Sequence, residues 1–403
     1  MTQTSDVIQQ TGLRFAAALS TREDASKAID EVCDAALGQL AATPDFAMVF
    51  VSPAYGPQFE PLAARLCERL GTENVLGCTG ESIVGNGQEI EGEAAISLWL
   101  AHLPGVSVTS MHLDFERTPE GGTFIGWPDE LPEPWPKDAA LLLLGEPYSF
   151  PADELIRRLN EDQPGVPVIG GMASGGFGPG ENQVILGRKV YNSGAVAAVI
   201  HGGVRIRTVV SQGCRPVGRT FVITKAEQNV IRELSGRPAM QQLQEVFATL
   251  SPEEQKMVRH GLHVGQVISE YQDRFGRGDF LVRNVVGADP ESGAIAIGDF
   301  VRPGQTVQFH IRDAASADED LRELLRAHRG AREGNALGAL LFTCNGRGTR
   351  LFPEPHHDAG CVRDALGDGP LAGFFAQGEI GPVGGRNFLH GFTASLAIFE
   401  KNE

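Results

Sequence analysis

Two glycine-rich segments near the carboxyl end of the chain carry the residues best suited to ligand binding. A guanidinium presents a planar fork of donors that suits a carboxylate, either of a ligand or of Glu379, and Arg347 lies in the first segment. For Arg347 a ligand clamp and a structural ion pair are therefore both open. A carboxylate among exposed backbone amides suits an ammonium group, and Glu379 lies in the second segment. We therefore expect a pocket for a small zwitterion such as an amino acid. Its predicted lining residues are Cys344, Asn345, Gly346, Arg347, Gly378, Glu379 and His390.

Cys344 also permits an enzymatic interpretation. A thiol close to a guanidinium has its thiolate favoured, which suits a nucleophile, and His390 could then act as the base. Cys78 is the second candidate nucleophile. Because free cysteines are among the most buried residues, we favour a packing role for Cys344. A reactive thiol would indicate an enzyme, whereas an inert one would favour a ligand sensor; a protein-interaction scaffold is a third possibility.

His357 and Cys361 are four residues apart, so they share one face of a predicted helix, and Asp358 lies beside them. These residues could bind a metal, but a solvated helix end is the preferred interpretation. The glycine-rich loops lack the spacing of nucleotide-binding fingerprints, and Ser174 is not in a GxSxG elbow. We predict neither a metal site nor a cofactor.

The elements around the two segments form a strand, a helix and a second strand. Residues 338–343 are a continuous apolar run, residues 355–366 have a helical apolar stripe, and residues 370–376 are a second apolar run. Both glycine-rich loops thus follow the carboxyl ends of strands joined by a crossover helix. Open α/β sheets place their ligand crevices at such ends.

The same strand–helix–strand pattern occurs twice more, starting near Phe46 and Ala139. In each copy the second strand ends in small residues, reading VLGCTGE at 75–81, VIGGMAS at 168–174 and LAGFFAQGE at 371–379. We infer an internal duplication in the first half and a looser third copy at the end. Glu81 and Ser174 occupy places comparable to Glu379, so both join the predicted ligand-binding residues.

The predicted fold is α/β with mixed α+β character. It has two lobes built from repeated β-α-β-Gly-loop-β units, with mixed sheets covered by helices. Residues 1–220 form the first lobe, with units at about 46–113 and 139–210, and residues 221–403 form the second, with a unit at about 338–399. Residues 94–102 and 106–113 are expected to pair as an antiparallel hairpin. Residues 222–234 and 239–250 are expected to be helical.

Composition limits the possible partners. A net charge of −17 disfavours nucleic acid and anionic membranes as partners. The first dozen residues lack the basic and apolar regions of a signal peptide, and no apolar run has the length of a membrane span. Six cysteines without CxxC spacing indicate free thiols in a reducing cytoplasm, namely Cys33, Cys67, Cys78, Cys214, Cys344 and Cys361.

Six segments, in this order and spacing, resemble the FIST family, which combines FIST N and FIST C regions. They are LGCTGESIVG (76–85), PVIGGMASGG (167–176), SGRPA (235–239), FLVRNVVGADPESGAIAIGD (280–299), LLFTCNGRG (340–348) and LAGFFAQGEIGP (371–382). The resemblance implies a cytoplasmic sensor of small ligands, with amino acids or related metabolites as suspected ligands. The chain has no room for an appended output domain, so we expect it to signal to a protein partner in trans.

Overall fold

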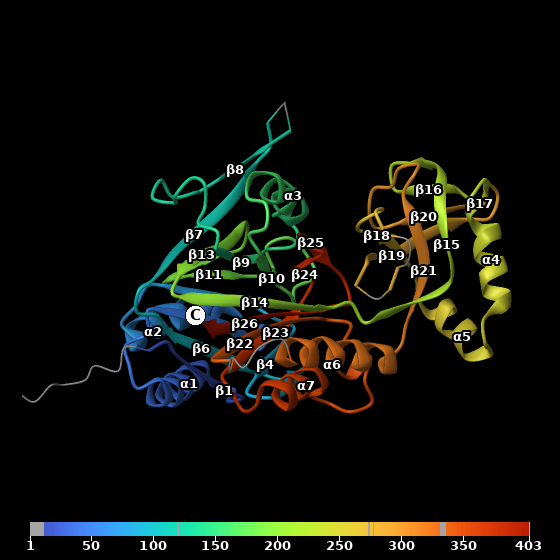
Figure 1. The fold of residues 1–403 in the computed structure, drawn as a ribbon. Coiled ribbons are helices and arrows are strands. Elements are labelled where there is room, and N and C mark those ends of the chain that lie inside the picture. Colours follow the sequence, from blue (N-terminus) through green and yellow to red (C-terminus); the bar gives the residue numbers. More distant parts are fainter. Residues whose placement is uncertain (1–11, 119–120, 273–274, 277, 331–335, 403) are drawn as a thin grey trace, which may run out of the picture.

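The computed structural model describes residues 12–402 apart from 119–120, 273–274, 277 and 331–335. It consists of a large body and a smaller domain at one side (Figure 1). Residues 214–313 make up the small domain, and the body is built from the chain on either side of it. Among the described residues, no helix combines the length and the hydropathy that crossing a membrane requires.

The body contains three strand–helix–strand units, as the repeated sequence pattern predicts. The first unit consists of β2 (Phe46–Val51), α2 (Phe59–Leu70) and β3 (Val75–Thr79). The second consists of β9 (Ala140–Gly145), α3 (Ala152–Asp162) and β10 (Val168–Met172). The third consists of β22 (Gly338–Cys344), α7 (His357–Leu366) and β23 (Leu371–Ala376). In every unit the two strands are parallel neighbours, so the repeat is confirmed, including its third copy.

A glycine at the third position of the second strand marks each unit. A Cβ atom on Gly77, Gly170 or Gly373 would lie 2.4, 1.9 or 1.8 Å from a carbonyl oxygen of the parallel neighbour. Those distances are far below van der Waals contact, so any side chain there would push the two strands apart. The shared glycine in the three sequence segments therefore has one physical cause.

The parallel strands of each unit belong to one of three mixed sheets, and the three sheets have the same strand order. This arrangement confirms the predicted α/β class. The first sheet adds four strands to β2 and β3: β1 (Arg14–Ser20), β6 (Ile96–His102), β11 (Val184–Leu186) and β12 (Lys189–Tyr191). The second adds five to β9 and β10: β7 (Val106–Glu116), β8 (Thr123–Ile125), β13 (Ala195–Gly202), β24 (Glu379–Val383) and β25 (Arg386–His390). The third adds four to β22 and β23: β4 (Ser82–Gly85), β5 (Gln88–Glu91), β14 (Val204–Ser211) and β26 (Ala394–Lys401).

In each unit, the hairpin that follows the second parallel strand pairs with the second parallel strand of another unit. The hairpin β4–β5 leaves the first unit and pairs with β23 of the third. The hairpin β24–β25 leaves the third unit and pairs with β10 of the second. The hairpin β11–β12 leaves the second unit and pairs with β3 of the first. The exchange therefore closes as a ring of three.

The expected antiparallel hairpin over residues 94–113 is wrong for a related reason. Strand β6 stays in the first sheet, where it pairs with β1 and β2. Strand β7 crosses to the edge of the second sheet and pairs with β13. The next such strand, β14, likewise crosses to the edge of the third sheet, where it pairs with β26. Strand β1, from the amino-terminal part of the chain, fills the corresponding edge of the first sheet.

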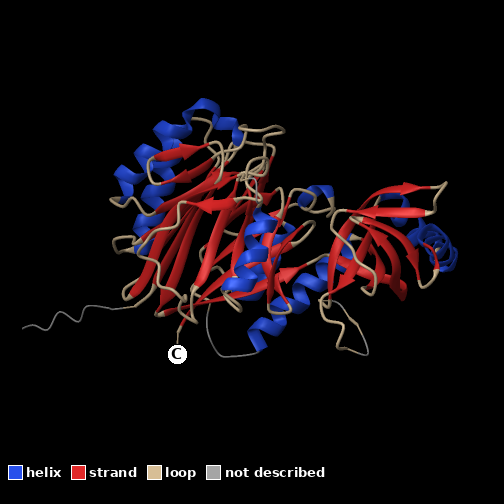
Figure 2. Cartoon of the chain, turned by 90° about the horizontal axis from the view of Figure 1, so that it is seen from above, coloured by secondary structure: helices blue, strands red, loops and turns tan. Residues whose placement is uncertain are grey.

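The inner faces of the three sheets share one hydrophobic core, and the helices lie outside it. Phe50 of the first sheet stacks on Phe374 of the third at 5.2 Å between ring centroids. The same core includes Leu142 and Val196 of the second sheet. Helices α1 (Ala25–Leu40) and α2 cover the first sheet, α3 covers the second, and α6 (Ala314–Gly330) and α7 cover the third. Figure 2 shows these helices at the periphery of the body.

The small domain is an antiparallel sheet with two helices, inserted between β14 and α6. Its elements are β15 (Cys214–Glu227), β16 (Val230–Leu234), β17 (Arg237–Pro238), α4 (Ala239–Thr249), α5 (Pro252–His260), β18 (Leu262–Val267), β19 (Phe280–Asp289), β20 (Ala294–Ile297) and β21 (Thr306–Arg312). The helix expected at residues 222–234 is wrong. Phe221 and Ile223 are buried on either side of exposed Val222, which is the alternation of a strand. The hairpin turns at Gln228, whose φ is 53°.

Candidate functional site

Arg347 is fully buried and holds a carboxylate of the protein itself. Its Nε lies 2.6 Å from Oδ2 of Asp358, and its Nη2 lies 2.8 Å from Oδ1. Although burial acts to raise it, the guanidinium holds the pKa of Asp358 well below its usual range. The partner is therefore Asp358 rather than Glu379, and the donor fork of Arg347 is already occupied. We correct its expected role from ligand clamp to structural ion pair.

Glu379 is fully buried and only half satisfied. Its Oε2 accepts hydrogen bonds from the amide and the hydroxyl of Thr393, at 2.9 and 2.8 Å. Its Oε1 has no hydrogen-bond partner among the described residues. Burial raises the pKa of Glu379 to about 7, against the lowering effect of Thr393 and of the neighbouring Cys344 thiol. An unpartnered buried carboxylate oxygen is costly, so this atom is a candidate contact for a ligand.

Cys344 and Asn345 adjoin Glu379 at the end of β22. The Cys344 sulfur accepts a hydrogen bond from the amide of Gly346 at 3.4 Å. Burial and the charge of Glu379 raise the pKa of the Cys344 thiol to about 12, so the thiol stays protonated near neutral pH. The amide oxygen of Asn345 is buried and has no partner among the described residues. Glu379 and Asn345 thus each have one unpartnered oxygen, and the protonated Cys344 thiol lies next to Glu379.

Three other predicted residues tie strand ends together. The hydroxyl of Ser174 donates to the carbonyl of Phe375 and accepts from the amide of Glu81 at 2.8 Å, so it joins the three units. The carboxylate of Glu81 pairs with Arg350. The carbonyl of Gly378 accepts a hydrogen bond from the amide of Met172 at 2.8 Å, which holds two units together.

His390 lies opposite Glu379 in the β24–β25 hairpin. Its Nε2 donates to the carbonyl of Gly381 at 2.9 Å. Burial lowers the pKa of His390 to about 4, so the ring is neutral at physiological pH. It is held by the hairpin itself, as expected for a satisfied core histidine.

A pocket of about 630 Å³ lies where the small domain meets the Gly346 loop of the third unit. Its lining residues are Glu253, Lys256, Met257, Gly261, His263, Arg312, Gly346, Arg350, Leu351 and Phe392. Three of these side chains carry a positive charge and one carries a negative charge. Burial lowers the pKa of His263 to about 4, so it adds no charge at neutral pH. The pocket therefore favours an anionic group.

Arg312 is the functional candidate that sequence reasoning missed. Its Nη2 donates to the carbonyl of Gly346, and its guanidinium lies 4.4 Å from the centroid of the Phe392 ring. Its Nε is buried without a partner, and no described carboxylate lies within ion-pair distance of it. In the sequence Arg312 only follows a predicted strand at residues 306–311, so no local signal distinguishes it. Its position becomes informative once the small domain is placed against the third unit.

Two protein-family models match this chain. The model of the FIST N domain matches residues 45–237, and that of the FIST C domain matches residues 239–382. This chain belongs to the FIST family. FIST domains are generally regarded as sensory, ligand-binding domains. The change from the FIST N to the FIST C match falls at the start of α4, inside the small domain.

Relatives of similar length occur in mycobacteria. A protein of Mycobacterium tuberculosis strain H37Rv, described as uncharacterized, is 44% identical over 390 residues, covering 96% of this chain and 100% of its own. An uncharacterized protein of Mycobacterium bovis is 42% identical over 388 residues, covering 96% of this chain and 99% of its own. The similarity thus extends over the whole length of the first relative.

Proposed function

We propose that this FIST protein is a cytoplasmic sensor that binds a small zwitterionic metabolite, of the amino-acid type, between its small domain and its third unit. The observation that carries the proposal is Arg312, a partly buried guanidinium that faces a pocket without a carboxylate partner. Burial lowers the pKa of Arg312, which reflects the cost of keeping its charge away from water. A ligand carboxylate would offset that cost.

In this proposal one end of the ligand contacts the small domain and the other contacts the body. Arg312 of the small domain holds the carboxylate, and Phe392 packs against the ligand from the body. We assign the ammonium group to the unpartnered Oε1 of Glu379 and the amide oxygen of Asn345. Neither residue is among the pocket-lining residues, so the pocket must open toward the end of β22 to admit this end of the ligand. Glu379 thus keeps the role expected from the sequence, and Arg312 replaces Arg347.

Such a ligand would connect the small domain to the body, so its binding could change how the two are arranged. Arg312 ends β21, and α6 begins two residues later at Ala314, so the bound guanidinium is joined directly to a helix of the body. A ligand shifts a conformational equilibrium only if it binds one arrangement of the protein more tightly than the other. We propose that a signalling protein in trans reads this shift.

The thiol chemistry favours binding over nucleophilic catalysis. A thiol with a pKa of about 12 supplies almost no thiolate near pH 7, and Cys344 has that pKa. Burial also raises the pKa of Cys78 well above its usual value, and its side chain lies in the central core.

Binding of a panel of amino acids and other small carboxylates, followed by thermal unfolding, tests the proposal. A ligand at one hundred times its dissociation constant stabilises the native state by roughly 2.7 kcal/mol, which raises the melting temperature. Arg312→Gln should abolish this rise. Arg219→Gln is the matched control. Like Arg312, Arg219 stacks on an aromatic ring, with its guanidinium 4.9 Å from the centroid of Phe221, but it does not line the pocket. A ligand that stabilises Arg312→Gln as strongly as the wild type would refute the proposed site.

A further inference from the structure

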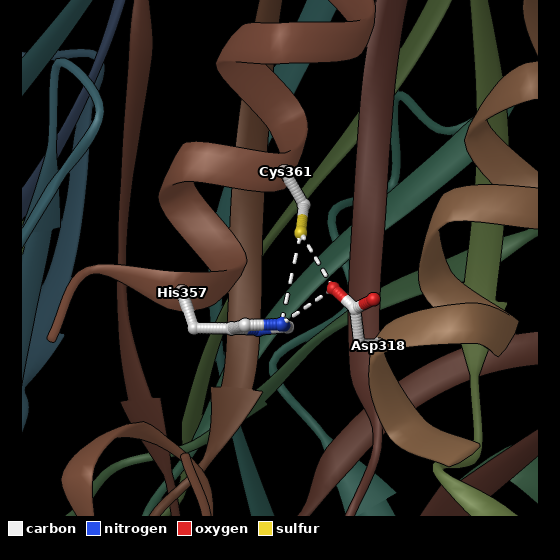
Figure 3. Close-up of side chains that lie close together, drawn as sticks. All are labelled: Asp318, His357 and Cys361. Atoms are coloured by element: carbon white, nitrogen blue, oxygen red, sulfur yellow. Dashed lines mark hydrogen bonds and ion pairs between the residues drawn. The ribbon is translucent and has the colours of Figure 1, made fainter. Parts of the chain in front are cut away.

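Asp318, His357 and Cys361 converge on one point between α6 and α7. Figure 3 shows Asp318 on one helix facing His357 and Cys361 on the other. The Nε2 of His357 lies 2.9 Å from Oδ1 of Asp318. The Cys361 sulfur lies 3.8 Å from the same oxygen and 3.9 Å from the same nitrogen. One carboxylate, one imidazole and one thiol therefore point at a common centre.

These separations are close to those of a tetrahedral metal site. With bond lengths of about 2.0 to 2.3 Å, the ligand atoms around a tetrahedral zinc ion lie roughly 3.3 to 3.6 Å apart. The observed range of 2.9 to 3.9 Å brackets these values. Small side-chain movements would place all three atoms at bonding distance.

The histidine is oriented as metal-binding histidines usually are. Its Nδ1 lies 2.9 Å from Oδ1 of buried Asp358, which is itself held by Arg347 and by the hydroxyl of Thr343. The ring of Phe352 stacks on the imidazole at 3.4 Å with an interplanar angle of 9°. A carboxylate on the far nitrogen directs Nε2 outward as the ligand atom, and such second contacts raise the affinity of metal sites.

The carboxylate ligand is oriented too. Arg322 donates to Oδ1 of Asp318 from one helical turn further along α6, at 2.7 Å. Both nitrogens of His357 face carboxylate oxygens, with Nδ1 toward Asp358 and Nε2 toward Asp318. A metal ion bound between Nε2, Asp318 and the Cys361 sulfur would release the thiol proton to solvent.

We propose that Asp318, His357 and Cys361 bind one zinc ion, with water as the fourth ligand. Thiolate and imidazole are ligands of zinc and of related transition metals, and they are poor ligands for magnesium and calcium. The ion joins α6 to α7, the two helices that cover the third sheet. This inference is independent of the proposed ligand pocket, because it rests on other residues and other readouts.

Cobalt(II) substitution tests the site in the full-length protein. Cobalt bound to a cysteine thiolate gives a charge-transfer absorption in the near ultraviolet, and tetrahedral coordination gives intense visible bands. We expect one cobalt ion per chain with both signals, displaced by one equivalent of zinc and unaffected by millimolar magnesium. Absence of binding, or cobalt binding without the charge-transfer absorption, would overturn the proposal.

Variants identify the ligands. Cys361→Ser should lose the charge-transfer absorption, whereas Cys67→Ser should keep it, because Cys67 is a buried helical cysteine of the first unit. Asp318→Asn serves as a second variant, since Asp318 is partly exposed and its loss need not disturb folding. It should weaken zinc binding by at least about tenfold. Equal zinc affinities for Asp318→Asn, Cys361→Ser and the wild type would show that the three residues form only an ion pair beside a packed thiol.

Discussion

The second and third units share a strand order and a glycine that lets their parallel strands approach closely. They differ in the hydrogen bonds of a buried glutamate, which follows the first parallel strand in the second unit and the second parallel strand in the third. Glu146 follows β9 in the second unit, and its Oε2 accepts from the amides of Tyr148 and Ser149 and from the Ser149 hydroxyl. Its other oxygen accepts from Asn182 at 3.4 Å. Glu379, after β23 in the third unit, leaves one oxygen unpartnered. One unit completes its own hydrogen bonds, whereas the other leaves an acceptor open.

The third unit also differs from the second in its neighbour. Its Gly346 loop faces β21 and α5 of the small domain, with a pocket between them. A repeated framework can therefore be closed in one copy and kept open in another, depending on what packs against its strand ends. Binding groups are expected where repetition leaves a polar atom unsatisfied.

The largest expected effect concerns the ion pair beneath the open site. Arg347→Met leaves the buried Asp358 carboxylate without its partner, so it should lower the free energy of unfolding by about 3–5 kcal/mol. Arg350→Met removes an exposed pair with Glu81 and should cost about 1 kcal/mol or less. Urea unfolding of both variants without ligand measures the contrast. Equal losses would show that Arg347 is not the structural anchor of this unit.

A smaller effect with opposite signs should distinguish the two glutamates at pH 8. The pKa of Glu379 is raised from 4.5 in the unfolded chain to about 7, so its contribution to stability is full below the unfolded value and is lost as pH rises toward 7. Glu379→Gln should therefore gain about 2 kcal/mol relative to the wild type between pH 5 and pH 8. Glu146→Gln should lose about 1–3 kcal/mol at pH 8, because an amide NH₂ would face two backbone donors.

Urea unfolding across this pH range measures both changes. Burial lowers the pKa values of His263, His310 and His390 to about 4, which adds a separate pH dependence between pH 4 and 6.5. That dependence is common to the wild type and the variants, so their differences isolate the glutamates. A parallel pH dependence for Glu379→Gln and wild type would place an unrecognised partner on Glu379.

The smallest expected effect is on Cys344. Cys344→Ser should change the free energy of unfolding by about 1 kcal/mol or less, because the thiol takes part only in weak hydrogen bonds, which a hydroxyl can also make. At pH 7.5 the folded protein should react slowly with a thiol reagent, and all six cysteines should react after denaturation. Fast modification of one thiol, abolished by Cys344→Ser, would instead support the enzymatic interpretation.

Much of the repeated fold can be predicted from the sequence, but less of the site can. Apolar runs ending in glycine predict the parallel strand pairs because burial and close strand approach are local requirements. The destination of a short hairpin such as β4–β5 depends on a sheet more than 280 residues away in the chain, and no local pattern encodes it. The helix expected at residues 222–234 failed because its apolar residues fit both periods.

The site shows the same limit. Glycine loops drew attention to Arg347 and Glu379, and both are buried polar groups near the end of a strand pair. Which arginine is satisfied depends on tertiary partners: Asp358 occupies Arg347, whereas Arg312 has no carboxylate beside it. Pairwise distances of this kind are absent from a linear pattern.

The ring of exchanged hairpins has a consequence for how the chain can be divided. Every unit borrows two strands from another, so the body has the connectivity of a closed trimer whose three members are covalently joined in one polypeptide. Deleting one unit would remove a hairpin from the sheet of a second, exposing a strand edge there, and would leave the hairpin of the third without a strand to pair with. The small domain is inserted between β14 and α6, and all three hairpin exchanges remain in place around it. The body therefore tolerates an inserted domain, but it would not tolerate the loss of one of its three units.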